Sequence, residues 1–107
     1  MAFVGFLAAH NIQIPGGPST VVETLRIDTI YEGGVKDIVF AQNDGRFYYI
    51  NRGLEQGFTL ENLRALLLNK TVTLHVPNVL AGPSRHISKL ELEGKEIFNE
   101  NTHIYTN

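Results

Sequence analysis

The chain has 107 residues, which is enough for one domain with a hydrophobic core of its own. Its formal net charge of -2 argues against a general nucleic-acid-binding protein, because neutralising phosphates requires a basic surface. The chain contains no cysteine, which excludes disulfides, thiolate metal sites and a cysteine nucleophile.

The first 19 residues are predicted to form an apolar N-terminal arm. The run from Ala2 to Ala9 lacks the basic leader of a signal peptide and is too short to span a bilayer. The following PGGPS, Pro15 to Ser19, discourages regular structure. We therefore expect an arm over residues 1–19 that packs on its own domain or on a second copy, a single domain over residues 20–107, and a cytoplasmic rather than an exported protein.

Three strands are predicted in the first half of the domain. TVVETLRIDTIY, Thr20 to Tyr31, is rich in β-branched residues and predicts the first strand. VKDIVFAQ, Val35 to Gln42, is the second. Asn43 to Gly45 is a strong hairpin signal, because Asn, Asp and Gly tolerate positive φ. RFYYIN, Arg46 to Asn51, is therefore the third strand and runs antiparallel to the second.

After the third strand, the spacing of hydrophobic residues changes from the period of a strand to the period of a helix. Leu63 and Leu67 lie on one leucine stripe, which predicts a short helix over residues 60–68 with its apolar side against the sheet. Thr59 is suited to cap its first turn, and Asn69 to end it in a left-handed conformation. The loop NRGLEQG before the helix is interpreted as a strand-to-helix connection with glycines at positive φ.

The second half returns to the period of a strand. In TVTLHVP, Val72, Leu74 and Val76 point one way while Thr73 and His75 point the other. NVLAGPS is predicted to be a loop. RHISKLELEG predicts a fifth strand with a bulge after its isoleucine, EIFNE a sixth, and NTHIYTN an edge strand or a tail.

This order of elements predicts a mainly β protein with one short helix. Three strands, a helix and two or three further strands are typical of a small OB-like or SH3-like barrel, with an α+β roll as the alternative. LLNKTVTLHV and RHISKLELEGKEIF also resemble a recurring layout in small uncharacterised bacterial β-barrel proteins. That resemblance covers roughly the last half of the chain and implies a small β-barrel without implying an activity.

The stretch RFYYINRG is the most distinctive candidate site. Because side chains alternate along a strand, we predict that Tyr48 packs inward with Ile50 while Tyr49 lies on an exposed or partner-covered face. A binder of single-stranded nucleic acid would surround such rings with basic residues, for which Arg46 and Arg52, with Arg26 on a neighbouring strand, are the candidates.

The sequence has no motif typical of a metal site or of a catalytic site. The four histidines, His10, His75, His86 and His103, have no metal-ligand spacing. Ser84 and His86 are too close in an extended segment to form a catalytic pair. Glu91 and Glu93 are interpreted as the solvated face of the fifth strand. We predict no catalytic residue, no metal and no cofactor.

The leading hypothesis is a non-enzymatic protein-interaction or self-association module, whose partner is another protein or a second copy in a homodimer. The first alternative is a small-molecule-binding protein or enzyme with a pocket at the barrel mouth, lined by Tyr48, Tyr49, Arg52 and His75. The second alternative is single-stranded nucleic-acid binding over the same strands.

Overall fold

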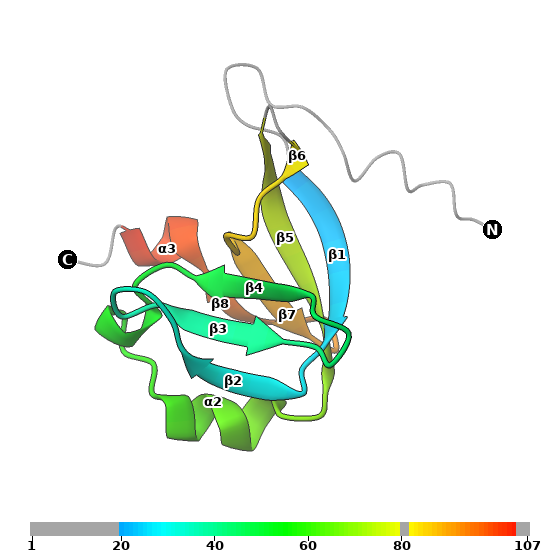
Figure 1. Ribbon diagram of the computed structural model, residues 1–107. Helices are drawn as coiled ribbons and strands as arrows, with labels where there is room; N and C mark the ends of the chain where they lie inside the picture. Colours follow the sequence, from blue (N-terminus) through cyan, green and yellow to red (C-terminus); the bar gives the residue numbers. More distant parts are fainter. Residues whose placement is uncertain (1–19, 80–81, 105–107) are drawn as a thin grey trace.

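The structure, a computed structural model, describes residues 20–79 and 82–104 and is mainly β (Figure 1). The predicted arm thus lies outside the described residues. The elements are β1 (Thr20–Arg26), β2 (Thr29–Glu32), β3 (Ile38–Ala41), β4 (Phe47–Ile50), the 3-10 helix η1 (Gly53–Glu55), α2 (Leu60–Leu67), β5 (Thr71–Val79), β6 (Gly82–Pro83), β7 (Lys89–Leu92), β8 (Lys95–Asn99) and α3 (Glu100–Ile104). A mainly β fold is confirmed.

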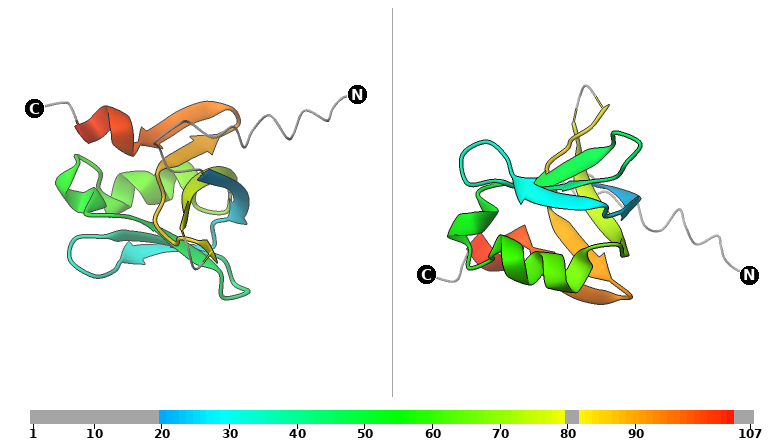
Figure 2. Two further views of the ribbon diagram at one scale, coloured as in Figure 1. Left: turned by 90° about the horizontal axis from the view of Figure 1, so that it is seen from above. Right: turned by 60° about the horizontal axis from the view of Figure 1, so that its bottom comes forward.

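The strands form two antiparallel sheets. One sheet has the order β1-β5-β7-β8, with β6 paired to β5, and the other has the order β2-β3-β4. The strands of the second sheet run across those of the first, and α2 lies beside β2 (Figures 1 and 2).

The single strand predicted from Thr20 to Tyr31 is wrong, because it is divided between the two sheets. Ile27 still bonds toward β5: its N–H donates to the Lys70 carbonyl at 2.8 Å and its carbonyl accepts from the Asn69 N–H at 2.6 Å. Asp28 donates instead to the Ala41 carbonyl, at 2.8 Å, on the other sheet. The chain therefore changes sheets between these two residues, where it bends into β2.

The predicted hairpin is confirmed. β3 and β4 pair in antiparallel register from Ile38 opposite Ile50 to Ala41 opposite Phe47. Gly45 has a φ of 98°, a conformation that side chains other than glycine rarely adopt. The turn residues thus favour this hairpin locally, before any tertiary contact forms.

The predicted helix is confirmed as α2. The Thr59 hydroxyl accepts a hydrogen bond from the Asn62 N–H at 3.1 Å, which satisfies one free donor of the first turn. Leu63 and Leu67 are buried, and Asn69 follows the helix in a left-handed conformation with a φ of 68°. The capping residues and the leucine stripe together explain why the helix occupies this stretch.

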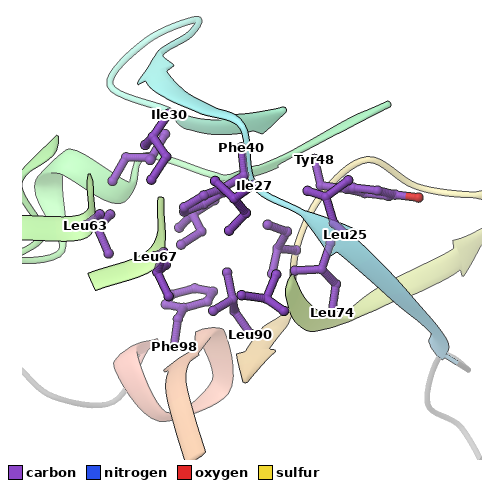
Figure 3. Packing of buried hydrophobic residues seen from close by; sticks show 14 of the residues in the cluster. Leu25, Ile27, Ile30, Phe40, Tyr48, Leu63, Leu67, Leu74, Leu90 and Phe98 are labelled. Atoms are coloured by element: carbon purple, nitrogen blue, oxygen red, sulfur yellow. The ribbon is translucent and has the colours of Figure 1, made fainter. Parts of the chain in front are cut away.

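The core lies between the two sheets and α2 (Figure 3). The inward alternation predicted for β5 is confirmed, since Val72, Leu74 and Val76 are all buried. Phe40 from β3 and Phe98 from β8 are the largest fully buried side chains. The fully buried side chains are all hydrophobic among those that the structure describes.

The structure corrects the prediction for the C-terminal part in four places. The fifth strand begins at Lys89 and not before, so Ile87 is buried outside it. The irregularity lies between Leu90 and Glu91, where β7 pairs with β8. Glu93 lies in the following turn with a φ of 52° and not on the strand. Residues 101–104 of the predicted final edge strand or tail belong instead to α3, which gives the described part of the fold a second helix.

Two smaller predictions concern loops. In NVLAGPS the predicted loop is partly paired as strand, because Asn78 and Val79 of β5 pair with the two residues of β6. In NRGLEQG the strand-to-helix connection is confirmed, and Gly57 has the expected positive φ of 93°. Gly53 serves a different purpose: a Cβ there would lie 2.7 Å from Ile38 Cδ1, so the position requires a residue without a side chain.

Candidate functional site

The candidate site begins with the alternation of side chains on β4. Tyr48 and Ile50 are buried against the core, and Tyr48 is only 5% exposed. Phe47 is 39% exposed, and Tyr49 points to the same face as Phe47. The prediction that Tyr48 and Ile50 pack inward while Tyr49 faces outward is therefore confirmed.

The register of the three strands extends this face across the whole sheet. Tyr31 on β2 lies opposite Val39 on β3, which in turn lies opposite Tyr49 on β4. Because directly opposed residues share a face, two tyrosine rings flank a smaller side chain on the outside of the sheet. In the next row, Ala41 lies opposite Phe47.

We define the outer face of sheet β2–β3–β4 by Tyr31, Val39, Ala41, Phe47 and Tyr49. Tyr31 is 43% exposed, so aromatic rings from both outer strands reach solvent. Tyr31 was absent from the sequence-based site. Its position on this face follows from the register of the two strand pairs β2–β3 and β3–β4. That register can be assigned only when the break between β1 and β2 is known.

Residues 84–88 connect this sheet to the other one. Tyr49 donates its N–H to the Arg85 carbonyl at 2.9 Å and accepts from the Ile87 N–H at 2.8 Å. On the opposite side of the segment, Ser88 donates its N–H to the His75 carbonyl at 2.8 Å. The segment therefore pairs with β4 along one side and with β5 along the other.

His86 places its ring on Tyr49. The two rings are stacked, with centroids 6.0 Å apart and planes at 18°. His86 Nε2 lies 2.6 Å from Glu100 Oε1, and both side chains are half-buried. The Ser84 hydroxyl accepts from the backbone N–H of His86 and not from its ring. The ring is therefore held by Tyr49 and Glu100.

Arg85 lies on the aromatic rings of β4. Its guanidinium carbon is 4.9 Å from the centroid of Phe47 and 5.7 Å from that of Tyr48, within the range of cation–π attraction. Its Nη1 also lies 3.5 Å from the Phe47 carbonyl oxygen, the long limit of a hydrogen bond. Across the described part of the chain, no carboxylate lies within 4.0 Å of it.

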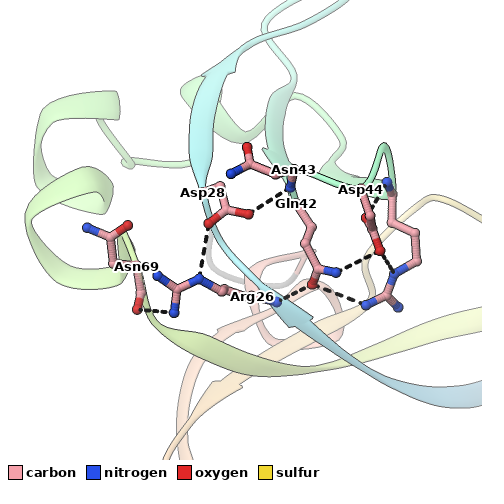
Figure 4. A network of polar contacts seen from close by, with 7 residues as sticks. Arg26, Asp28, Gln42, Asn43, Asp44 and Asn69 are labelled. Atoms are coloured by element: carbon pink, nitrogen blue, oxygen red, sulfur yellow. Dashed lines mark hydrogen bonds and ion pairs between the residues drawn. The ribbon is translucent and has the colours of Figure 1, made fainter.

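The arginines that the sequence suggested as companions of the rings are paired elsewhere. Arg26 binds Asp28 at 3.1 Å, and Arg46 binds Asp44 at 3.5 Å. Both belong to a polar network around Gln42, which accepts from the Arg26 N–H at 2.8 Å and ties the bend after β1 to the β3–β4 hairpin (Figure 4). This network has a structural role and does not reach the outer face through any contact of the described residues.

The four residues predicted to line a pocket have separate surroundings. Tyr48 packs in the core, whereas Tyr49 stacks on His86. Arg52 binds Glu55 at 2.8 Å, and this hydrogen bond lowers the pKa of the glutamate. His75 lies 3.4 Å from Glu91 on the other sheet. Within the described residues no hydrogen bond, ion pair or ring contact joins any two of the four, and their ligand-binding role stays a prediction.

The two histidines whose side chains the structure describes, His75 and His86, do not converge either. His75 and His86 each contact a glutamate of their own, and residues 20–79 and 82–104 contain no group of three acidic or histidine side chains arranged to hold a metal ion. Of the helices described, none is long and apolar enough to cross a membrane.

Comparison of the chain with protein-family models, with curated proteins and with solved structures found no match. The resemblance to small bacterial β-barrel proteins therefore stays a prediction.

Proposed function

We propose that this protein is a non-enzymatic interaction module that binds another protein, or a second copy of itself, through the outer face of sheet β2–β3–β4. The observation that carries the proposal is the grouping of Tyr31, Phe47 and Tyr49 on one sheet face beside Arg85. Tyrosine, phenylalanine and arginine are the residues enriched at protein–protein interfaces, and tyrosine and arginine dominate binding hot spots.

The rigidity of the face supports the same proposal. Tyr49 is held by two backbone bonds to the segment 84–88 and by the His86 ring, and Phe47 is fixed in a hairpin beside the Arg85 guanidinium. Residues that are ordered before binding lose little conformational entropy when a partner arrives. A sheet face with fixed rings suits contact with a protein surface.

The type of β fold is also part of the proposal. We infer a small barrel of the OB-like or SH3-like kind. Two connections support it: the chain passes directly from β1 into β2 of the other sheet, and residues 84–88 pair with both β4 and β5. In such a barrel the outer face of sheet β2–β3–β4 would be one wall, with its rings directed outward.

The test is the size of the complex that the chain forms in an extract of its own organism. The double substitution Tyr31→Ser and Phe47→Ser should shift the chain from a larger species to the free chain in size-exclusion chromatography. Val79→Ser is the matched control, since Val79 is also exposed, at 54%, but lies on β5. Circular dichroism verifies that both variants fold. The proposal would be refuted if the Val79→Ser control also lost the complex, or if the double variant still formed it.

A further inference from the structure

We propose that Arg85, at the β4 edge of the outer face, is its anchor and that it receives a carboxylate of the partner polypeptide, beside aromatic or large apolar partner side chains that rest on Phe47 and on Tyr31. This inference rests on the proposed function and specifies its partner as an acidic segment of a protein chain. It is carried by the contacts of Arg85 and by the exposed ring of Phe47 beside it.

The first step is the unused bonding capacity of Arg85. Arg26, Arg46 and Arg52 each have a carboxylate partner, and Arg64 donates to the Ile30 carbonyl. Arg85 is exposed, and among the described atoms its hydrogen-bonding partner is one carbonyl oxygen at 3.5 Å. Most of its N–H donors therefore face water and remain available to a ligand.

The second step is the orientation of the guanidinium. The rings of Phe47 and Tyr48 lie within 5.7 Å of its carbon, and the buried Tyr48 ring is held by the core. A guanidinium that rests on rings keeps the N–H groups of its edge free, and this edge matches the two oxygens of a carboxylate. Stacking also reduces the side-chain entropy lost on binding.

The third step is the apolar surface next to this charge. Phe47 and Tyr31 are exposed on the same face, and between them lie the half-buried Ala41 and Val39, which is only 8% exposed. A partner side chain that covers these rings would bury apolar surface beside the ion pair. The face therefore fits a segment in which an acidic residue lies next to an aromatic or aliphatic one.

The fourth step distinguishes an acidic protein segment from a nucleic acid. A strand of phosphates needs several cations along its path, whereas within residues 20–79 and 82–104 the outer face has one guanidinium without a carboxylate partner, that of Arg85. His86, whose ring stacks on Tyr49, already contacts Glu100, and the chain as a whole has a net charge of -2. One guanidinium among rings suits one carboxylate of a protein.

The test uses a random-peptide library displayed on phage and selected against the full chain. We expect the selected peptides to be enriched in Asp or Glu adjacent to aromatic or leucine residues, and the selection against Arg85→Gln to lose this enrichment. Arg52→Gln is the control, because Arg52 already binds Glu55. A selection that shows no acidic enrichment, or the same enrichment with Arg85→Gln, would overturn the inference.

The best peptide then allows a direct measurement on the 15N-labelled chain by NMR. Its shifts should cluster at Phe47, Tyr49 and Arg85, and the peptide with Gln in place of its acid should bind about tenfold more weakly or worse. Arg85→Lys should also weaken binding, because lysine lacks the planar fork. Equal affinity for the acid and amide peptides would overturn the inference.

Two outcomes separate this inference from the proposed function. Binding at the outer face that is insensitive to Arg85→Gln would remove the carboxylate anchor and leave the interaction surface standing. Tighter binding of an oligothymidylate than of any selected peptide, with the same dependence on Arg85, would overturn the protein partner and make the face a nucleic-acid surface.

Discussion

The imidazole of His86 lies stacked on the ring of Tyr49, with centroids 6.0 Å apart. Tyr49 belongs to β4, and His86 to the segment that also bonds to β5, so the stack joins the outer face of one sheet to the other sheet. Glu100, at the start of α3, holds the imidazole at 2.6 Å. Tyr49 thus belongs both to the outer face and to the junction between the two sheets.

We expect His86→Ala to lower the free energy of unfolding by about 1–2 kcal/mol, because it removes a ring contact and a hydrogen bond. The amide of Ile87, which donates to the Tyr49 carbonyl, should exchange faster with deuterium. Urea denaturation and hydrogen exchange measure these effects. His75→Ala is the control on the other sheet, and equal exchange of the Ile87 amide in both variants would contradict the role given to the stack.

The free edge of β2 gives a second prediction. Arg64 on α2 donates two hydrogen bonds, at 2.7 and 3.0 Å, to the Ile30 carbonyl oxygen. Arg64→Met keeps the aliphatic packing but leaves this carbonyl without its donor, which should cost about 1–3 kcal/mol of unfolding free energy. Arg52→Met, which removes only an exposed ion pair, should change the unfolding free energy far less. If the two variants are equally stable, Arg64 does not secure the edge.

The leucine stripe of α2 gives a third prediction. Leu63 is buried in the core, so Leu63→Ala should destabilise the protein by about 2–5 kcal/mol in denaturant titrations. Leu66, on the same helix, is 44% exposed, and Leu66→Ala should cost much less. Similar losses at the two positions would show that the helix presents a different side to the sheets.

The fourth prediction concerns acid stability. Burial raises the pKa of Glu91, but hydrogen bonds from Lys89 and His75 outweigh it and hold the pKa below its usual value. Such a carboxyl stabilises the fold above its unfolded-state pKa, about 4.3 for glutamate, and loses that contribution as the pH falls through the lower folded value. Below about pH 4.3 the wild type should therefore lose more unfolding free energy than Glu91→Gln. Parallel stability–pH curves would exclude this contribution.

The elements that sequence analysis predicted correctly depend on neighbouring residues. Thr59 caps a helix whose turn follows directly, and Asn43 to Gly45 form a turn from their own backbone preferences. The alternation of Val72, Leu74 and Val76 likewise reflects burial of one side of one strand. In each case the determining interaction lies within a few residues.

The features that sequence analysis missed depend on distant partners. The bend after Ile27 exists because Asn69 and Lys70 bind that residue, while Ala41 binds Asp28. Arg85 reaches Phe47 across 38 positions of the chain, so no local pattern could have assigned it to the aromatic face. Tyr31 joins that face only through the register of three strands, which a one-residue error would have reversed.

Photo-crosslinking from the outer face tests the proposed interaction most directly. A benzoylphenylalanine placed at Tyr31, with the chain expressed in its own organism, should give a discrete crosslinked protein that mass spectrometry identifies as another protein or a second copy. The same group at Lys95, which is exposed on β8 of the other sheet, should not give this product. Crosslinks of equal yield from both positions, or none from Tyr31, would contradict the account.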